Sequence, residues 1–212
     1  MTIGAPDLAA GIVAYWNLGF EINGNGVVRN DGDRIELVRG KEGLQSIALL
    51  SDDLAKDSAR GNADYARLVG KSDARAPSKH PNGVQRIERV YIAVTDVAAA
   101  AAHYARALGV PAPKMERGTV INADMAIFQF GPTGFGLAQP AGPGVCADAL
   151  TRRGPGPFQI LYRTRSMDAA AKWMADHGVP PPARGIRNTG EQAMLVLPAH
   201  ACGVVIGFVG PA

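Results

Sequence analysis

The 212-residue sequence lacks most features that mark specialised classes of protein. It has two cysteines, Cys146 and Cys202, and no Cys-x-x-Cys pair, which excludes a disulfide framework, a zinc ribbon and thioredoxin-like chemistry. Residues 1–16 contain no basic segment, and Pro6-Asp7 interrupts their apolar run. They therefore predict neither a signal peptide nor a membrane span, and we expect a cytoplasmic protein with reduced thiols.

The sequence also lacks a strong excess of either sign of charge. The 22 basic residues nearly balance the 19 acidic ones, and the longest basic cluster is Arg152-Arg153. We therefore expect no nucleic-acid partner and no membrane partner. The absence of Gly-x-Gly-x-x-Gly after a strand, of a Walker A motif and of Gly-x-Ser-x-Gly argues against a nucleotide-binding doubly wound fold and a serine hydrolase.

What the sequence does contain is a repeat. Four segments share a short apolar strand, a Ser/Thr/Pro-Asp step and an Ala-rich amphipathic stretch; they span residues 2–20, 44–70, 87–110 and 158–179. The alternating, β-branched run 90–94 is typical of a half-buried strand. Gly19, Gly109 and Gly178 stand where a helix ends in a left-handed residue, so each repeat predicts a strand followed by a helix.

The expected helix starts share a capping residue and a nearby acid. Ser51, Thr95 and Ser166 are the expected N-caps, and Asp53, Asp96 and Asp168 would place negative charge in the first turn.

Short strands with turn signals follow three of the repeats. We expect them near 26–29 and 34–38, at 125–130 and 135–139, and at 193–197 and 204–209, so that the repeating unit is βαβββ. The second repeat is expected to lack these strands and to run into a linker at 71–83. The predicted fold class is α+β. A degenerate N-terminal part spans 1–75, a linker spans 76–83 and a complete pair of modules spans 84–212.

The motifs IERVYIAVTDV…YARALGV, DLAAGIVAYWNLGFEI, DRIELVRG and HPNG resemble those of the vicinal oxygen chelate (glyoxalase/bleomycin-resistance/extradiol-dioxygenase) superfamily. The resemblance covers nearly the whole chain. It implies that paired βαβββ modules form curled, cup-shaped mixed sheets. In that family a metal usually sits in the cup, held by His, Glu or Gln on the first and last strands, and stabilises enolate-like charge as a Lewis acid.

Carried over by residue, the resemblance predicts no metal in the C-terminal pair. Arg89 and Gly136 stand at the ligand positions of the third repeat, and Gln159 and Gly207 at those of the fourth. Arginine stays protonated and cannot ligate a cation, and glycine offers no side chain. We therefore expect neither a metal nor another cofactor.

The N-terminal half matches two ligand positions, Glu36 and Gln45. The first-strand position of the first repeat would precede Met1, and two ligands do not close a site. The sequence leaves open whether the chain begins short or whether residues precede Met1.

Strand alternation places Arg89 and Tyr91 on one face, and Gln159, Leu161 and Arg163 on the matching face of another strand. If these faces line the cup, Arg89 would bind a substrate carboxylate or phosphate, and Gln159 would orient a substrate oxygen. The alternative for Arg89 is a structural ion pair with an acid such as Glu88.

Two further residues are candidates for the site. Glu36 would be the catalytic general base if burial raises its pKa. The alternatives are that Glu36 is retained from metal-binding relatives without a function, or that it forms an ion pair with Arg34 or Arg39. His200 would reach the mouth of the cup, or would lie on the surface.

Two functional hypotheses remain from the sequence. The first is a metal-independent lyase or isomerase that acts on a small oxygenated, anionic metabolite. The second is a non-catalytic small-molecule-binding protein of the bleomycin-resistance type. A third hypothesis is a homodimer that completes a metal site between chains.

Overall fold

The computed structural model describes residues 1–29, 33–51, 59–70 and 79–211. It divides into two compact units that interleave along the chain. The first unit contains Met1–Gln45, Arg75–Glu88 and Gln159–Ala212, and the second contains Ser46–Ala74 and Arg89–Phe158.

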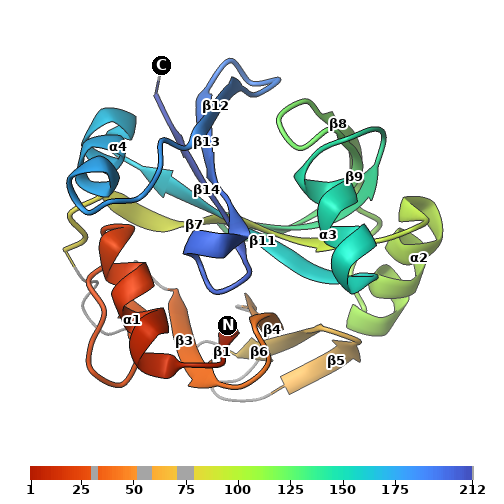
Figure 1. Cartoon of the computed structure of the whole chain (residues 1–212). Helices are drawn as coiled ribbons and strands as arrows, with labels where there is room; N and C mark the ends of the chain where they lie inside the picture. The colour runs from red at the N-terminus through yellow and green to blue at the C-terminus, as the bar shows by residue number, and fades with distance from the viewer. Residues whose placement is uncertain (30–32, 52–58, 71–78, 212) are drawn as a thin grey trace. The chain divides into compact units, whose positions relative to one another are not determined.

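The first unit combines elements from both ends of the chain. Its N-terminal elements are β1 (Thr2–Ala5), α1 (Leu8–Asn17), β2 (Val27–Arg29) and β3 (Arg34–Arg39). Its C-terminal elements are most of β11 (Gly156–Thr164), α4 (Met167–Asp176), β12 (Ala183–Ile186), β13 (Gln192–Val196), a 3-10 turn (Pro198–His200) and β14 (Val205–Gly210). The strands follow the orders β2-β3-β1 and β12-β13-β14-β11. The first and last strands of each repeat pair in parallel, β1 with β3 and β11 with β14. Helix α4 packs along β13 and β14 (Figure 1).

The second unit has the same plan in its larger part. Its elements are most of β4 (Gly43–Ser51), β5 (Ala59–Ala63), β6 (Ala66–Gly70), the end of β7 (Val84–Ala93), α2 (Val97–Leu108), β8 (Lys114–Gly118), β9 (Ala123–Phe130), β10 (Thr133–Pro140) and α3 (Val145–Arg153). The strand orders are β4-β6-β5 and β7-β10-β9-β8. Strand β7 pairs in parallel with β10, and α2 packs on β9 and β10 (Figure 1).

The third and fourth repeats therefore have the predicted βαβββ order, and the α+β class is confirmed. The helix signals of these two repeats are confirmed, except that the N-cap of α2 is Asp96 rather than Thr95; Asp96 accepts the amide of Ala99 at 2.9 Å. Ser166 caps α4 as predicted. The three glycines expected after helices, Gly19, Gly109 and Gly178, have φ of 84°, 64° and 75°.

The strand expected at the start of the second repeat is present as β4, but the described part that follows it was predicted wrongly. Ser51 lies in β4 rather than capping a helix, and the trailing strands thought to be missing are the hairpin β5–β6. The hairpin turns at Asp64, whose φ is 33°, a left-handed value that aspartate tolerates better than most residues. The Gly-Asn-Ala-Asp sequence at 61–64 was thus a turn signal inside a stretch read as helical. Asp53 and the linker residues 71–78 lie outside the described residues, and helix α3 was not predicted.

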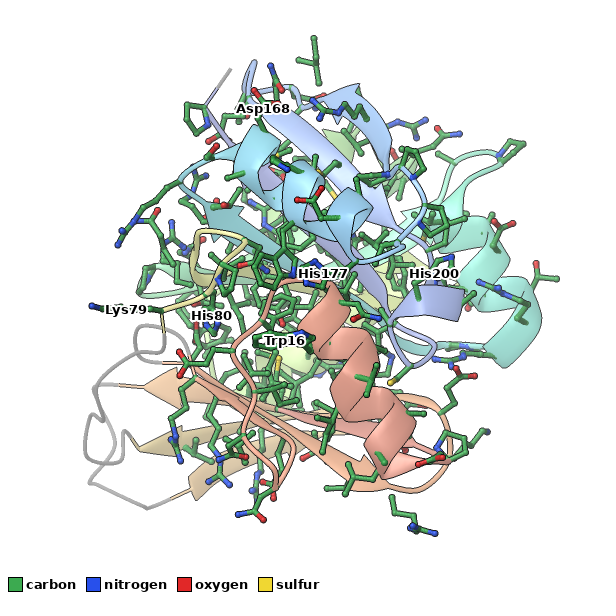
Figure 2. All side chains as sticks on the ribbon, turned by 60° about the vertical axis from the view of Figure 1, so that its left-hand side comes forward. Trp16, Lys79, His80, Asp168, His177 and His200 are labelled. Atoms are coloured by element: carbon green, nitrogen blue, oxygen red, sulfur yellow. The ribbon has the colours of Figure 1, made fainter. Side chains whose placement is uncertain are left out.

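The HPNG segment ties separate parts of the first unit together. His80 is buried (Figure 2): its Nδ1 accepts the amide of Glu21 at 2.9 Å, and its Nε2 lies 2.9 Å from the carbonyl of Arg29. Asn82 donates from its amide to the carbonyl of Leu18 at 2.9 Å. Burial lowers the pKa of His80, which keeps the ring neutral and able to accept a hydrogen bond.

No helix among the described residues combines the length and apolar character that a bilayer crossing needs.

Candidate functional site

In the second unit the candidate site is built on β7. The Arg89 side chain is held by the Glu116 carboxylate, which accepts from its Nη1 at 2.7 Å, and by the Tyr91 hydroxyl at 3.3 Å. Burial alone would lower the pKa of Arg89, but Tyr91 and Glu116 outweigh it and raise the pKa. Its Nε is buried and has no hydrogen-bond partner among the described residues. Arg89 is therefore a fixed cation whose Nε–H is unused.

Tyr91 covers the glycine that stands at the family's last-strand ligand position. Gly136 is its register partner on β10, and a Cβ added at Gly136 would lie 2.6 Å from the Tyr91 ring. The space that a ligating side chain would need at Gly136 is already filled.

The first unit repeats this arrangement on β11. Leu161 is the register partner of Gly207 on β14, and a Cβ added at Gly207 would lie 2.5 Å from Cδ1 of Leu161. Gln159 is 1% exposed, and its Oε1 has no hydrogen-bond partner among the described residues. A buried acceptor without a partner costs about 1–3 kcal/mol, so it requires an explanation.

An ion-pair cluster lies at the end of the same strand. The Arg163 guanidinium donates two hydrogen bonds to the Glu88 carboxylate, from Nε at 2.9 Å and from Nη2 at 3.1 Å. Its Nη1 lies 2.8 Å from Glu191. Arg86 lies 2.7 Å from Glu88, and Arg187 lies 2.7 Å from Glu191. The side chains of this arginine–glutamate cluster are 15–26% exposed.

The cluster holds its two glutamates as carboxylates. Burial would raise the pKa of Glu88, but hydrogen bonds from Arg163 and the charges of Arg86, Arg163 and Arg187 outweigh it and lower the pKa. For Glu191 the hydrogen bond from Arg163 is the largest cause of a lowered pKa. Both groups are therefore poor proton acceptors near neutral pH.

The remaining predicted residues make other contacts within the first unit. Glu36 on β3 pairs with Arg34 at 3.0 Å, with its side chain 43% exposed. Gln45 donates to the backbone carbonyls of Lys41 and Gly43. His200 ends the 3-10 turn and is half-buried (Figure 2).

A divalent metal does not fit the four positions at which the family holds it. In the second unit they carry a guanidinium and a glycine covered by Tyr91; in the first unit they carry a neutral amide and a glycine covered by Leu161. Across the part of the chain that is described, no three His, Cys, Asp or Glu side chains gather as a metal site would require.

Sequence reasoning missed the partners of the arginines. Glu116 is 27 residues from Arg89, and Glu88 is 75 residues from Arg163. The one available signal was the group of charged residues Arg86, Glu88 and Arg89 in a strand otherwise rich in apolar residues.

Comparison with known proteins agrees with this architecture. The model of the Glyoxalase/Bleomycin resistance protein/Dioxygenase superfamily matches residues 88–196. No curated protein matches. Among solved structures, methylmalonyl-CoA epimerase from Mycobacterium tuberculosis is similar over 61% of this chain and 90% of its own, with 26% identity and a TM-score of 0.55.

Another solved structure is similar in fold. A Streptomyces coelicolor methylmalonyl-CoA epimerase variant in complex with 2-nitronate-propionyl-CoA covers 61% of this chain and 99% of its own, at 24% identity and a TM-score of 0.52. The family match extends over half of the sequence, and the βαβββ repeats agree with it. The chain belongs to the Glyoxalase/Bleomycin resistance protein/Dioxygenase superfamily.

Proposed function

We propose that this chain binds a small oxygenated metabolite that carries a carboxylate or phosphate, and that it does so without a resident metal ion. The observation that carries the proposal is the surplus of positive charge around Arg89 in the second unit. Arg89 and Lys114 share the single carboxylate of Glu116. This group keeps one positive charge for an anion.

The chemistry of arginine suits this role. Its planar fork matches the two oxygens of a carboxylate or phosphate, and a half-buried guanidinium is less screened than an exposed one. The unused Nε of Arg89 and the unused Oε1 of Gln159 supply a donor and an acceptor at buried positions. Buried polar atoms without partners favour a ligand-binding role for both residues.

A second candidate function is an isomerase-type proton transfer on such a metabolite. The structural likeness to the M. tuberculosis epimerase favours it. The arginines lower the pKa of Glu88 and of Glu191, which makes both carboxylates weak bases. Glu36 is therefore the residue proposed to move the proton. Binding remains the better-supported function, because Glu36 is itself half-exposed and paired with Arg34.

Thermal shift at low salt tests the binding proposal. The probes are malonate, inorganic phosphate and methylmalonyl-CoA, with glycerol as a neutral control. We expect a rise in Tm with at least one anion and none with glycerol, and we expect Arg89→Met to remove it. Arg117→Met is the matched control, since Arg117 forms an exposed pair with Asp124 at 3.0 Å. No response to any anion, or equal responses in both variants, would count against the proposal.

Proton transfer is tested separately, by incubating the protein with methylmalonyl-CoA in D₂O and following deuterium incorporation by mass spectrometry. The isomerase candidate predicts incorporation by the wild type and by Glu42→Gln, an exposed control, but none by Glu36→Gln. Tight binding of methylmalonyl-CoA without deuterium incorporation would support the binding function and would exclude the isomerase candidate.

A further inference from the structure

The second unit contains a cavity on the other side of β7 from Tyr91. Its volume is 340 Å³, within the range of small-molecule sites. Ile92 and Val94 line it, and these residues alternate with Tyr91 along the strand, so they face the opposite way. The cavity is thus separate from the residues assigned to anion binding.

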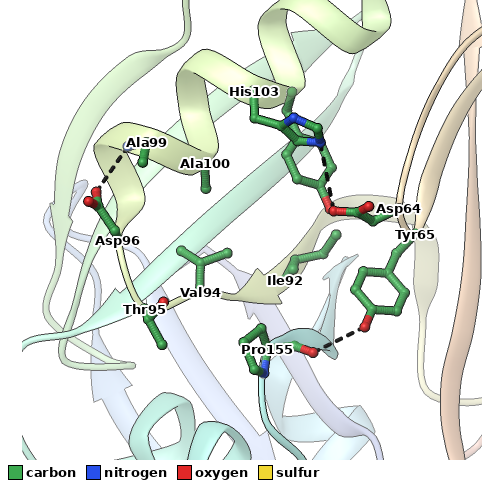
Figure 3. Close-up of a pocket in the computed structure, with 11 residues that line it drawn as sticks. Asp64, Tyr65, Ile92, Val94, Thr95, Asp96, Ala99, Ala100, His103 and Pro155 are labelled. Carbon is green, nitrogen blue, oxygen red and sulfur yellow. Dashed lines mark hydrogen bonds and ion pairs between the residues drawn. The ribbon is translucent and has the colours of Figure 1, made fainter.

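The floor of the cavity is apolar and its ends are acidic (Figure 3). Ile92, Val94, Ala99 and Ala100 form the middle, and Asp96 and Asp64 lie at opposite ends of the ring of labelled residues. Tyr65 closes one side, with its hydroxyl donating to the carbonyl of Pro155 at 3.2 Å. The arrangement suits a ligand with an apolar middle and polar ends.

The charge of the residues that line the cavity indicates which sign of charge the ends of the ligand should carry. Neither lysine nor arginine is among the described residues that line the cavity, and His103 pairs with Asp64 at 3.7 Å. Asp96 accepts one hydrogen bond, from the amide of Ala99, whereas a carboxylate has about four acceptor sites. Burial raises the pKa of Tyr104, and the charge of Asp64 raises it further, which is the sign of negative potential at this end.

We propose that this cavity binds a short alkyl diamine, with one ammonium group at Asp96, the other at Asp64, and the methylene chain on the apolar floor. Tyr65 and Tyr104 also line the cavity. The site is independent of the anion proposed above, because it uses other residues on another face of the strand.

The test is a backbone NMR titration of the full chain with 1,4-diaminobutane. We expect shift changes concentrated at Ala99, Ala100 and His103, weaker binding of 1-aminobutane, and no binding of butane-1,4-diol. Asp64→Asn and Asp96→Asn should each weaken binding about three- to fivefold, as expected for partly exposed charge pairs. Asparagine tolerates a left-handed φ and is a good N-cap, so both variants keep the local structure.

Two more variants distinguish binding in the cavity from non-specific attraction of the diamine to acidic residues on the surface. Ala100→Leu fills the cavity without changing charge and should abolish binding, whereas Asp148→Asn, an exposed acid outside the cavity, should leave it unchanged. Shifts spread over many surface acids, or a diamine response that survives Ala100→Leu, would overturn the proposal. Equal affinity for the monoamine and the diamine would also overturn it, since one carboxylate would then suffice.

Discussion

Gly207→Ala tests whether the ligand position on β14 has been filled by packing. The added Cβ would lie 2.5 Å from Leu161, 3.1 Å from the Gln159 amide nitrogen and 3.3 Å from Leu195. Leu161 and Gln159 are 5% and 1% exposed, so neither can move into solvent. Overpacking of this kind costs about 1–3 kcal/mol.

A strand glycine replaced by alanine regains about 0.5–1 kcal/mol from lower chain entropy in the unfolded state. The overpacking cost is larger, so we expect a net loss of about 1–2 kcal/mol. For a chain of this length that corresponds to a fall in Tm of roughly 2–8 °C. Urea denaturation followed by circular dichroism gives the free energy of unfolding directly.

The matched control is Gly40→Ala, because a Cβ at Gly40 meets no atom within 4 Å. It should be neutral or slightly stabilising. Leu161→Val should offset part of the cost in the double variant, with a coupling of at least about 0.5 kcal/mol. If Gly207→Ala were as stable as Gly40→Ala, the position would be open, and the packing argument would fail.

Three further variants probe the rest of the site. Gln159→Leu should raise the free energy of unfolding of the ligand-free protein by about 1–2 kcal/mol, because it removes a buried acceptor without a protein partner; a lower denaturation midpoint would refute this. Glu88→Gln should cost about 3 kcal/mol in chemical denaturation, because it removes one of the two carboxylates that the half-buried guanidiniums share, whereas Asp176→Asn, in an exposed pair, should cost under about 0.5 kcal/mol; equal costs would contradict the cluster's role. Because burial lowers the pKa of His80 in the folded protein, stability should be full above the unfolded pKa of about 6.5 and be lost as pH falls through the folded pKa. His80→Gln should flatten that dependence in thermal melts, and an unchanged slope would assign it to other groups.

The sequence predicted the fold where local signals agreed with each other. In the third and fourth repeats, strand alternation, a capping side chain and a glycine after the helix all mark the same boundaries, and the structure has those boundaries to within one residue. In the second repeat they conflicted. An Ala-rich, acidic stretch favoured a helix, but the turn at Asp64 and pairing of β6 with β4 and β5 produce a hairpin. Tertiary pairing decided the outcome there.

The sequence predicted at which strand positions the site residues stand, but not the contacts that these residues make. The resemblance located Arg89 and Gln159 on their strands, but the carboxylates that hold the arginines come from distant segments. No local pattern links Arg163 to Glu88, which is 75 residues away. The packing of Tyr91 against Gly136 likewise depends on strand register, which the sequence specified only in outline.

Elemental analysis of the purified, untagged protein tests the central claim most directly. The claim is that packed side chains, a guanidinium and an amide have replaced the metal ligands of the superfamily. We predict a content of manganese, cobalt, nickel and zinc far below one ion per chain after gel filtration. One divalent ion retained per chain, and lost in Gln159→Ala, would contradict the account.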